Sequence, residues 1–295
     1  MQKARDSGGG RWPGAPPQAA PAGSLGSTVA NKPPGAPQPA PVQRLRMRYT
    51  KRGRLRFTSH RDIARVFERA LRRAQVPMAY SSGFSPHPKV SWVGAAATGV
   101  ASEAEYVEIA LAQVCDPEAI RAALDASLPD GIDLIEAVEA TPGTSLPDLV
   151  QASSWVVELG GVSLVDLSAA VASFLAAQAV EVERMTKNGR RVFDTRSAVV
   201  SMVATEGDNC AILAMVVQHV TPAVRPDDVL SGLRSVSDLV TLVPPAATRL
   251  AQGPLTSEGE VADPLAPDRF AAGNAGASAG ATRQVDEVVG TTPPR

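Results

Sequence analysis

Cysteines are scarce in this sequence of 295 residues, and long apolar runs are missing. The two cysteines, Cys115 and Cys210, are far apart and show none of the close spacing of metal-binding cysteines. No apolar run approaches the ~18–20 residues that cross a bilayer, and the N-terminus lacks the continuous apolar core of a secretory signal. These absences predict a reduced, cytoplasmic protein without a membrane partner.

Both ends of the chain lack the periodic apolar pattern of a folded domain. Residues 1–41 consist largely of Pro, Gly, Ala, Ser and Gln, and residues 251–295 are also low in complexity. Such segments cannot bury enough apolar surface to offset chain entropy, so we expect two disordered tails. The remaining stretch, about 200 residues, is enough for one large domain or two small ones.

The net charge of −1 hides a strong asymmetry along the chain. Residues 44–112 hold 13 Lys and Arg against 5 Asp and Glu, a charge of +8, whereas residues 113–295 have a charge of −12. A basic half next to an acidic half predicts one face that attracts anions. A cation-rich helix and hairpin that are merely solvated would explain the composition equally well.

The first half of the foldable stretch, residues 42–140, alternates strand and helix patterns. Leu45, Met47 and Tyr49 alternate with arginines and predict a strand, and Leu55 and Phe57 predict a short second strand after a turn. The expected elements that follow are a helix from Ser59 to about Gln75, strands over 89–96 and 103–111, a helix opened by Pro117, and a strand over 131–140.

The second half, residues 150–250, repeats this order without obvious sequence identity. Its expected elements are a strand over 154–160, a helix over 164–178, a hairpin around 187–189, strands over 197–205 and 210–220, a helix over 225–236 and a last strand over 238–244. The order β, α, β, β, α, β is that of the split βαβ, or ferredoxin-like, pattern. We therefore expect an α+β protein of two ferredoxin-like halves, packed together and joined through residues 141–149.

Arginines gather on two expected surfaces of the first half. If both strands of the first hairpin are extended, one face of the sheet carries Arg44, Arg46, Arg48, Arg54 and Arg56. The helix that follows carries a basic stripe that includes Arg61, Arg65 and Arg69. Such surfaces bind phosphates, so RNA or an acidic partner protein is the expected ligand. Because Tyr49, Phe57 and Trp92 are equally well explained as core, we expect contacts with the RNA backbone rather than base stacking.

His60 and His87 are the candidates for chemistry. His87 lies between two prolines in SPHP, which stiffen the backbone and present the imidazole. His60 lies in the first turn of a helix beside Asp62, where the helix dipole disfavours a positive ring. A cluster of these three residues would suit zinc or iron, or acid–base catalysis, although structural hydrogen bonding is the plainer explanation. His219, at the end of an apolar strand, is expected to be structural. The further candidate catalytic residues are Lys89, Asp194 and Arg196.

A resemblance to a known family covers about residues 43–243. The stretch RLRMRYTKRGRLRFTSHRDIARVFERALRRAQVPMAYSSGFSPHPKVSW closely resembles the radical SAM-linked (radical SAM-associated) protein family, the domain of unknown function 2344 (DUF2344). The matched motifs are K-R-G-x-L-R-F-x-S-H-x-D, R-A-L-R-R-A and G-F-x-P-H-P-K, and VFDTRSAV and VRPDDVL match later segments. Members of the family are commonly encoded beside, or fused behind, radical SAM proteins. The resemblance therefore implies a radical SAM partner, but no established activity and no known cofactor.

The cysteine content limits what this association can mean. A radical SAM enzyme needs three closely spaced cysteine thiolates to hold its [4Fe–4S] cluster, and this chain has two distant ones. We therefore expect an accessory protein that works with a radical SAM enzyme and binds RNA or a partner protein through its basic face. The alternative is a metal-dependent or acid–base enzyme that uses His60, Asp62 and His87.

Overall fold

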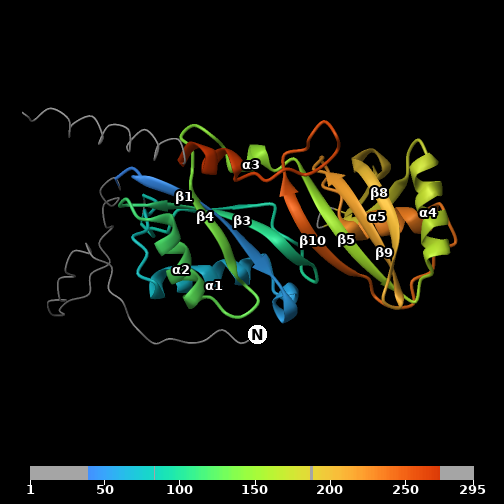
Figure 1. Ribbon diagram of the computed structural model, residues 1–295, viewed down its shortest axis with the longest axis horizontal. Helices are drawn as coiled ribbons and strands as arrows, with labels where there is room; N and C mark the ends of the chain where they lie inside the picture. Colours follow the sequence, from blue (N-terminus) through green and yellow to red (C-terminus); the bar gives the residue numbers. More distant parts are fainter. Residues whose placement is uncertain (1–38, 83, 187–188, 273–295) are drawn as a thin grey trace, which may run out of the picture.

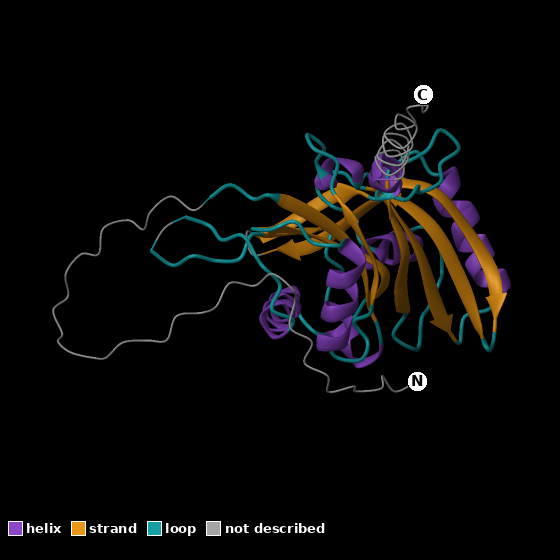
Figure 2. Ribbon diagram, turned by 60° about the vertical axis from the view of Figure 1, so that its left-hand side comes forward, coloured by secondary structure: helices purple, strands orange, loops and turns teal. Residues whose placement is uncertain are grey.

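One large mixed sheet runs through the whole protein. The computed structural model describes residues 39–82, 84–186 and 189–272. Eight strands form the sheet, in the order β4-β1-β3-β10-β5-β9-β8 with β2 paired to β3 beside this path. Figure 1 shows these strands following one another along the long axis of the molecule, with helices packed against the sheet (Figure 2). Most of the two predicted tails, residues 1–38 and 273–295, lies outside the described residues.

The first half of the chain builds the β4-β1-β3-β2 end of the sheet. Its elements are β1 Gln43–Lys51, η1 Gly53–Phe57, α1 His60–Arg73, β2 Val90–Val93, β3 Ala101–Leu111, α2 Pro117–Ser127 and β4 Leu134–Glu139. All strand pairs in this half are antiparallel. Leu45, Met47 and Tyr49 are buried against α1 and α2, which confirms the alternation predicted for β1. The predicted helices at Ser59 and Pro117 are confirmed as well.

The short second strand predicted after the first turn is wrong. Gly53 takes a positive φ of 55°, and the chain continues as the 3₁₀ helix η1 instead of pairing with β1. Two apolar side chains, Leu55 and Phe57, fit such a turn as well as they fit a strand. Arg54 and Arg56 therefore do not share a sheet face with the arginines of β1.

The second half of the chain builds the β10-β5-β9-β8 end. Its elements are β5 Ala152–Gly160, α4 Leu164–Ala176, β6 Glu181–Thr186, β7 Gly189–Asp194, η2 Arg196–Ala198, β8 Val199–Gly207, β9 Cys210–Gln218, α5 Pro226–Ser235 and β10 Ala246–Gly253. β6 and β7 form a separate antiparallel pair, while α4 and α5 pack with the sheet around one apolar core. The predicted hairpin is confirmed, although residues 187 and 188 of its turn lie outside the described residues.

The predicted last strand at residues 238–244 is wrong, and so is the start of the predicted C-terminal tail. Pro244 and Pro245 offer no backbone N–H, so strand pairing begins after them, in β10. β10 covers residues 251–253, and the described chain continues to residue 272. Leu265, well inside the predicted tail, is completely buried.

This C-terminal segment covers part of the first half. Leu265 packs with Tyr106 of β3, Val138 of β4 and Leu146 of α3 (Leu146–Leu149). Figure 1 shows the segment, in red, returning over the end of the sheet that carries β1 and β4, close to α3. The two halves meet where β10 pairs in parallel with β3. No helix in the described part of the chain is long and apolar enough to cross a membrane.

Candidate functional site

α1 presents a row of arginines to solvent. At ~100° of rotation per residue, Arg61, Arg65, Arg69 and Arg72 lie within an arc of about 80°, and all are exposed. The opposite side of the helix is buried, by Ile63, Phe67, Ala70 and Leu71. We name the exposed row, Arg61, Arg65, Arg69 and Arg72, the arginine stripe. The exposure of these four arginines agrees with the basic helix face expected from the sequence. The ligand of this face is still a prediction.

Asp62 is a capping residue at the start of α1. Its backbone N–H donates to Ser59 Oγ at 3.3 Å, and its carboxylate accepts the Ser59 hydroxyl at 2.6 Å. Arg65 Nη1 also donates to the carboxylate, at 3.1 Å. The hydrogen bond from Ser59, assisted by Arg65, lowers the pKa of Asp62. The carboxylate therefore stays charged and is engaged in local structure.

The arginines of β1 do not form the exposed face that the sequence predicts. Arg46 is 1% exposed, and its guanidinium donates to Glu108 at 3.0 Å, to Asp268 at 2.9 Å and to the Thr144 carbonyl at 2.8 Å. Arg48 Nε donates to the Glu103 carbonyl at 3.0 Å. The linker between the halves, residues 141–149, and the C-terminal segment contribute Thr144 and Asp268 to the cover of this face, so Arg46 is a buried structural residue.

Exposed aromatic residues flank α1 on both sides in sequence. Phe57 of η1 is 60% exposed, and the Arg56 guanidinium lies 4.7 Å from the centroid of its ring. Phe84, in the loop after α1, is 73% exposed, and Tyr80 is exposed as well. From the sequence, Phe57 was explained equally well as a core residue, and Phe84 was not singled out. A large aromatic residue among the small and polar residues of SSGFSP is the signal that could have identified Phe84.

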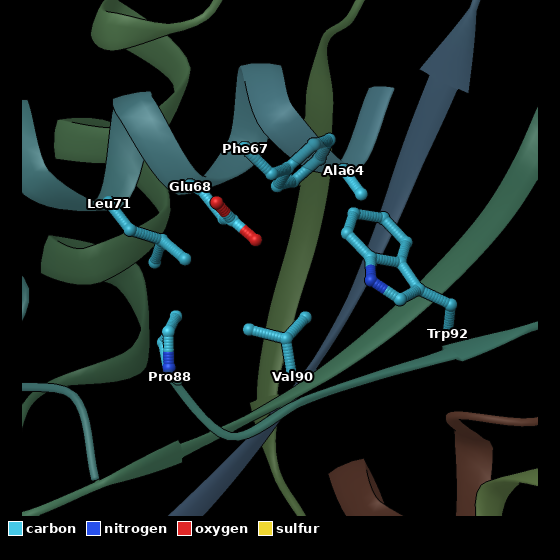
Figure 3. Close-up of a pocket in the computed structure, with 7 residues that line it drawn as sticks. All are labelled: Ala64, Phe67, Glu68, Leu71, Pro88, Val90 and Trp92. Carbon is cyan, nitrogen blue, oxygen red and sulfur yellow. The ribbon is translucent and has the colours of Figure 1, made fainter. Parts of the chain in front are cut away.

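A small hollow of about 90 Å³ separates α1 from the start of β2 (Figure 3). It is lined by Ala64, Phe67, Glu68 and Leu71 of α1 and by Pro88, Val90 and Trp92. The Trp92 ring meets the Phe67 ring edge to face, with centroids 5.0 Å apart. Figure 3 shows the Glu68 carboxylate pointing from the helix into the middle of this hollow. This hollow was not predicted from the sequence, because the contact of residues 88–92 with α1 is a tertiary one.

The two candidate histidines lie at opposite ends of this hollow. The His60 ring contacts Trp92, with centroids 5.3 Å apart, whereas His87 precedes Pro88 at the Leu71 end. Ala64 and Leu71 alone are about 10 Å apart along the helix axis. In the part of the chain that the structure describes, no three His, Cys, Asp or Glu side chains are grouped so that they could hold a metal ion. His60, Asp62 and His87 therefore do not form the metal cluster considered from the sequence.

The other candidate catalytic residues make local backbone contacts. Asp194 is partly buried, which raises the pKa of its carboxyl, but N–H groups of Val180, Arg196 and Ser197 donate to it, and the net effect is a lowered pKa. Arg196 donates to the Val199 carbonyl at 3.1 Å. Lys89 bonds through its backbone to Ala79 and Ala110. Asp194 and Arg196 belong to the second half and line neither of the two hollows described in this section.

Buried charges connect the two halves of the sheet. Glu105 of β3 accepts a hydrogen bond from Arg249 of β10, and both side chains are almost fully buried. Lys51 is 2% exposed, and its ammonium donates to the carbonyls of Ala96 and Ala97 at 3.3 and 3.1 Å. Burial lowers the pKa of Lys51, while the Glu105 charge opposes this effect. The Glu105–Arg249 pair joins the two halves, whereas Lys51 is held within the first half, so we assign all three groups to structure.

A second hollow, of about 710 Å³, lies between the start of β1 and the linker. It is lined by residues 41–44 and 139–147 together with Ser91 and Glu108. Arg44 and Glu108 pair across it at 2.9 Å, and the buried Thr141 hydroxyl has no hydrogen-bond partner among the described residues. Its volume falls in the range of small-molecule sites. Arg44 and Glu108 already pair with each other there, so α1 offers the stronger positive charge for a ligand.

Comparison with known proteins identifies the family. A family described as "Uncharacterized protein conserved in bacteria (DUF2344)" matches residues 44–226, from β1 to the first residue of α5. A search of curated proteins finds no match to this chain. The matched region is more than half of the sequence and contains the arginine stripe and the hollow beside it. The chain therefore belongs to the DUF2344 family.

Proposed function

We propose that this protein is an accessory protein that binds single-stranded RNA through the arginine stripe of α1. The observation that carries the proposal is the stripe itself, which places exposed guanidinium groups along about 16 Å of one helix face. These groups lie in the part of the chain with a charge of +8. The acidic residues beside the stripe on α1 are Asp62 and Glu68. Guanidinium groups bind phosphates well, because their fork of N–H donors fits the phosphate oxygens.

The exposed aromatic residues favour RNA over an acidic protein as the ligand. Proteins that bind single strands combine a positive track for the backbone with aromatic rings on which bases stack. Phe57, which precedes α1, and Phe84, in the loop that follows α1, are exposed, and Arg56 lies over the Phe57 ring. An acidic protein surface would pair with the arginines but would leave these rings without a partner.

Charge reversal on the stripe tests the proposal. We expect Arg65→Glu with Arg69→Glu to weaken binding of a fluorescent single-stranded RNA at least about tenfold at low salt, because phosphate contacts are replaced by repulsion. The matched control is Arg190→Glu with Arg191→Glu on the exposed β7 strand, which changes the net charge equally and should leave affinity within about twofold. Equal effects of both variants, or no binding by the wild type, would refute the proposal. Binding to an acidic polypeptide but not to RNA would point to a protein ligand.

We also infer that each half is a ferredoxin-like unit. The support is the strand order, β4-β1-β3-β2 in the first half and β10-β5-β9-β8 in the second. In both halves the chain runs through these strands and their helices in the order β, α, β, β, α, β, if the inserted β6–β7 hairpin is set aside. An experimental structure with a different strand order in either half would contradict this inference.

The association with a radical SAM enzyme is part of the proposal and rests on the resemblance of the motifs. A tagged copy of this chain should co-purify with a radical SAM protein from cells that express both, and nuclease treatment would show whether RNA bridges them. The alternative enzyme function, based on His60, Asp62 and His87, has less support because the two histidines lie at opposite ends of a hollow.

A further inference from the structure

The hollow between α1 and β2 has mainly apolar walls but also contains two polar groups, the Glu68 carboxylate and the Trp92 indole N–H. In the described ranges of the chain, the Glu68 side chain takes part in no ion pair or hydrogen bond, although arginines are its neighbours on the helix. Its carboxylate points into the hollow, as Figure 3 shows, and the Trp92 indole nitrogen lies on the same side. Phe67 and Val90 form apolar walls between them. The hollow therefore offers a hydrogen-bond acceptor and a donor between apolar surfaces.

Glu68 lies between the hollow and the arginine stripe. At ~100° per residue, Glu68 is about 20° from Arg61 on one side and about 40° from Ala64 on the other. Ala64 lines the hollow, and Arg61 belongs to the stripe. A ligand that fills the hollow would thus have its anionic part within reach of the guanidinium groups.

The charges around the hollow disfavour a simple cation and favour a ligand that has both an anionic group and N–H donors. A carboxylate beside aromatic rings would attract a simple cation, but Arg65 and Arg72, each about one helical turn from Glu68, repel one. A nucleotide suits both features, because its phosphate is anionic and its base carries N–H donors. The volume, about 90 Å³, is well below the ~300–1,000 Å³ of sites for whole small molecules. It suits one planar ring.

We propose that this hollow is a base-recognition site, in which Glu68 accepts a hydrogen bond from the exocyclic amino group of an unpaired RNA base such as cytosine. Carboxylates accept hydrogen bonds from the amino group of cytosine, and a good base contact discriminates by roughly 1–3 kcal/mol. Uracil has no amino group and presents a carbonyl oxygen there, which the carboxylate repels. The inference rests on the proposed RNA binding, and it adds a preference that the arginine stripe alone cannot produce.

The test compares oligocytidylate and oligouridylate of about eight nucleotides, measured by fluorescence anisotropy. We expect wild-type protein to bind the cytidine oligomer about fivefold more tightly. In Glu68→Gln this ratio should fall below about twofold, even if removal of the negative charge strengthens binding of both oligomers. The matched control is Glu158→Gln on the exposed part of β5, which should keep the wild-type ratio.

The outcomes separate this inference from the proposed function. Equal affinity for the two oligomers, or an unchanged ratio in Glu68→Gln, would overturn the base-recognition site and leave RNA binding standing. Failure of the wild type to bind either oligomer would overturn both. Because Glu68 is exposed, the variant should fold, and a second variant, Trp92→Phe, keeps the aromatic wall but removes the indole N–H. If the indole N–H donates to N3 of cytosine, Trp92→Phe should lower affinity for the cytidine oligomer more than for the uridine oligomer, since N3 of uracil carries a hydrogen; equal losses would contradict this contact.

Discussion

Phe57 is the residue whose exposure most directly links the structure to RNA binding. It is 60% exposed, directly before α1, with the Arg56 guanidinium over its ring. A base that stacks on this ring should be lost in Phe57→Ala, with affinity for single-stranded RNA falling by about 1–3 kcal/mol. Phe270→Ala, at a residue that is 73% exposed in the C-terminal segment, is the matched control. Equal, small effects of both variants would show that Phe57 is not a stacking platform.

His219 is expected to make stability depend on pH. Its Nδ1 lies 3.0 Å from the Val150 carbonyl, a contact that favours the protonated ring, and its Nε2 lies 2.7 Å from Ser153 Oγ. Burial lowers the pKa of His219, and the Arg249 charge adds to this effect. The unfolded chain then binds a proton more readily than the folded one, so stability is full above about pH 6.5 and falls as the pH drops below it. Urea denaturation at several pH values should show a smaller loss on acidification for His219→Gln than for wild type, and identical losses would contradict this assignment.

Arg46 and the arginines of α1 show how far single residues can be interpreted from sequence. Alternation correctly placed Arg46 opposite Leu45 and Met47, but it could not show that Asp268, far away in the chain, would bury it. The local sequence pattern predicts the sheet face on which a side chain lies. Which segment buries that face depends on the tertiary fold. The exposed arginines of α1 were predictable because the apolar stripe of the helix fixes its buried side within the helix itself.

α1 depends on its N-terminal cap. Ser59 accepts the Asp62 N–H and donates to the Asp62 carboxylate, so Ser59→Ala should lower the free energy of unfolding by about 1 kcal/mol. Thermal or urea denaturation measures this loss. Ser85→Ala, at an exposed serine in the loop after α1, is a control of the same chemistry outside a helix cap. A loss no larger than that of the control would show that the cap is not needed.

The elements that the sequence predicted correctly are those with their own boundary signals. α1, α2 and α5 begin at a capping residue or at a proline, and their apolar residues recur at helical spacing. The errors lie where the pattern is short or where prolines interrupt it, at η1 and before β10. The hollow beside α1 was not predictable either, because residues 88–92 reach the helix only through the pairing of β2 with β3.

The buried pair of Glu105 and Arg249 holds the two halves of the molecule together. Their side chains are 2% and 4% exposed and come from β3 and β10. Glu105→Ala leaves Arg249 buried without its charge partner, which should cost about 3–5 kcal/mol. Glu183→Ala removes an exposed pair with Arg190 and should cost less than about 1 kcal/mol. Denaturant unfolding of both variants checks this, and similar small losses would mean that the junction does not depend on the pair.

The whole-molecule arrangement was only partly readable from the sequence. The repeated order of elements suggested two similar halves, and the structure joins them into one sheet across β3 and β10. The sequence did not predict that the C-terminal segment covers the first half, because the composition of this segment resembles that of a disordered tail. In the structure, its residues Leu265 and Asp268 are buried. Its contacts join residues more than a hundred positions apart, which local patterns do not report.

The salt dependence of RNA binding tests the central claim most directly. If the arginine stripe neutralises phosphates, the logarithm of the association constant should fall linearly with the logarithm of salt concentration. The slope should be about −3 for four contacts to a single strand. In the Arg65→Glu, Arg69→Glu variant it should shrink to about half that value. An association constant that does not change with salt concentration, or a salt-dependence slope that is the same in the variant, would contradict the account.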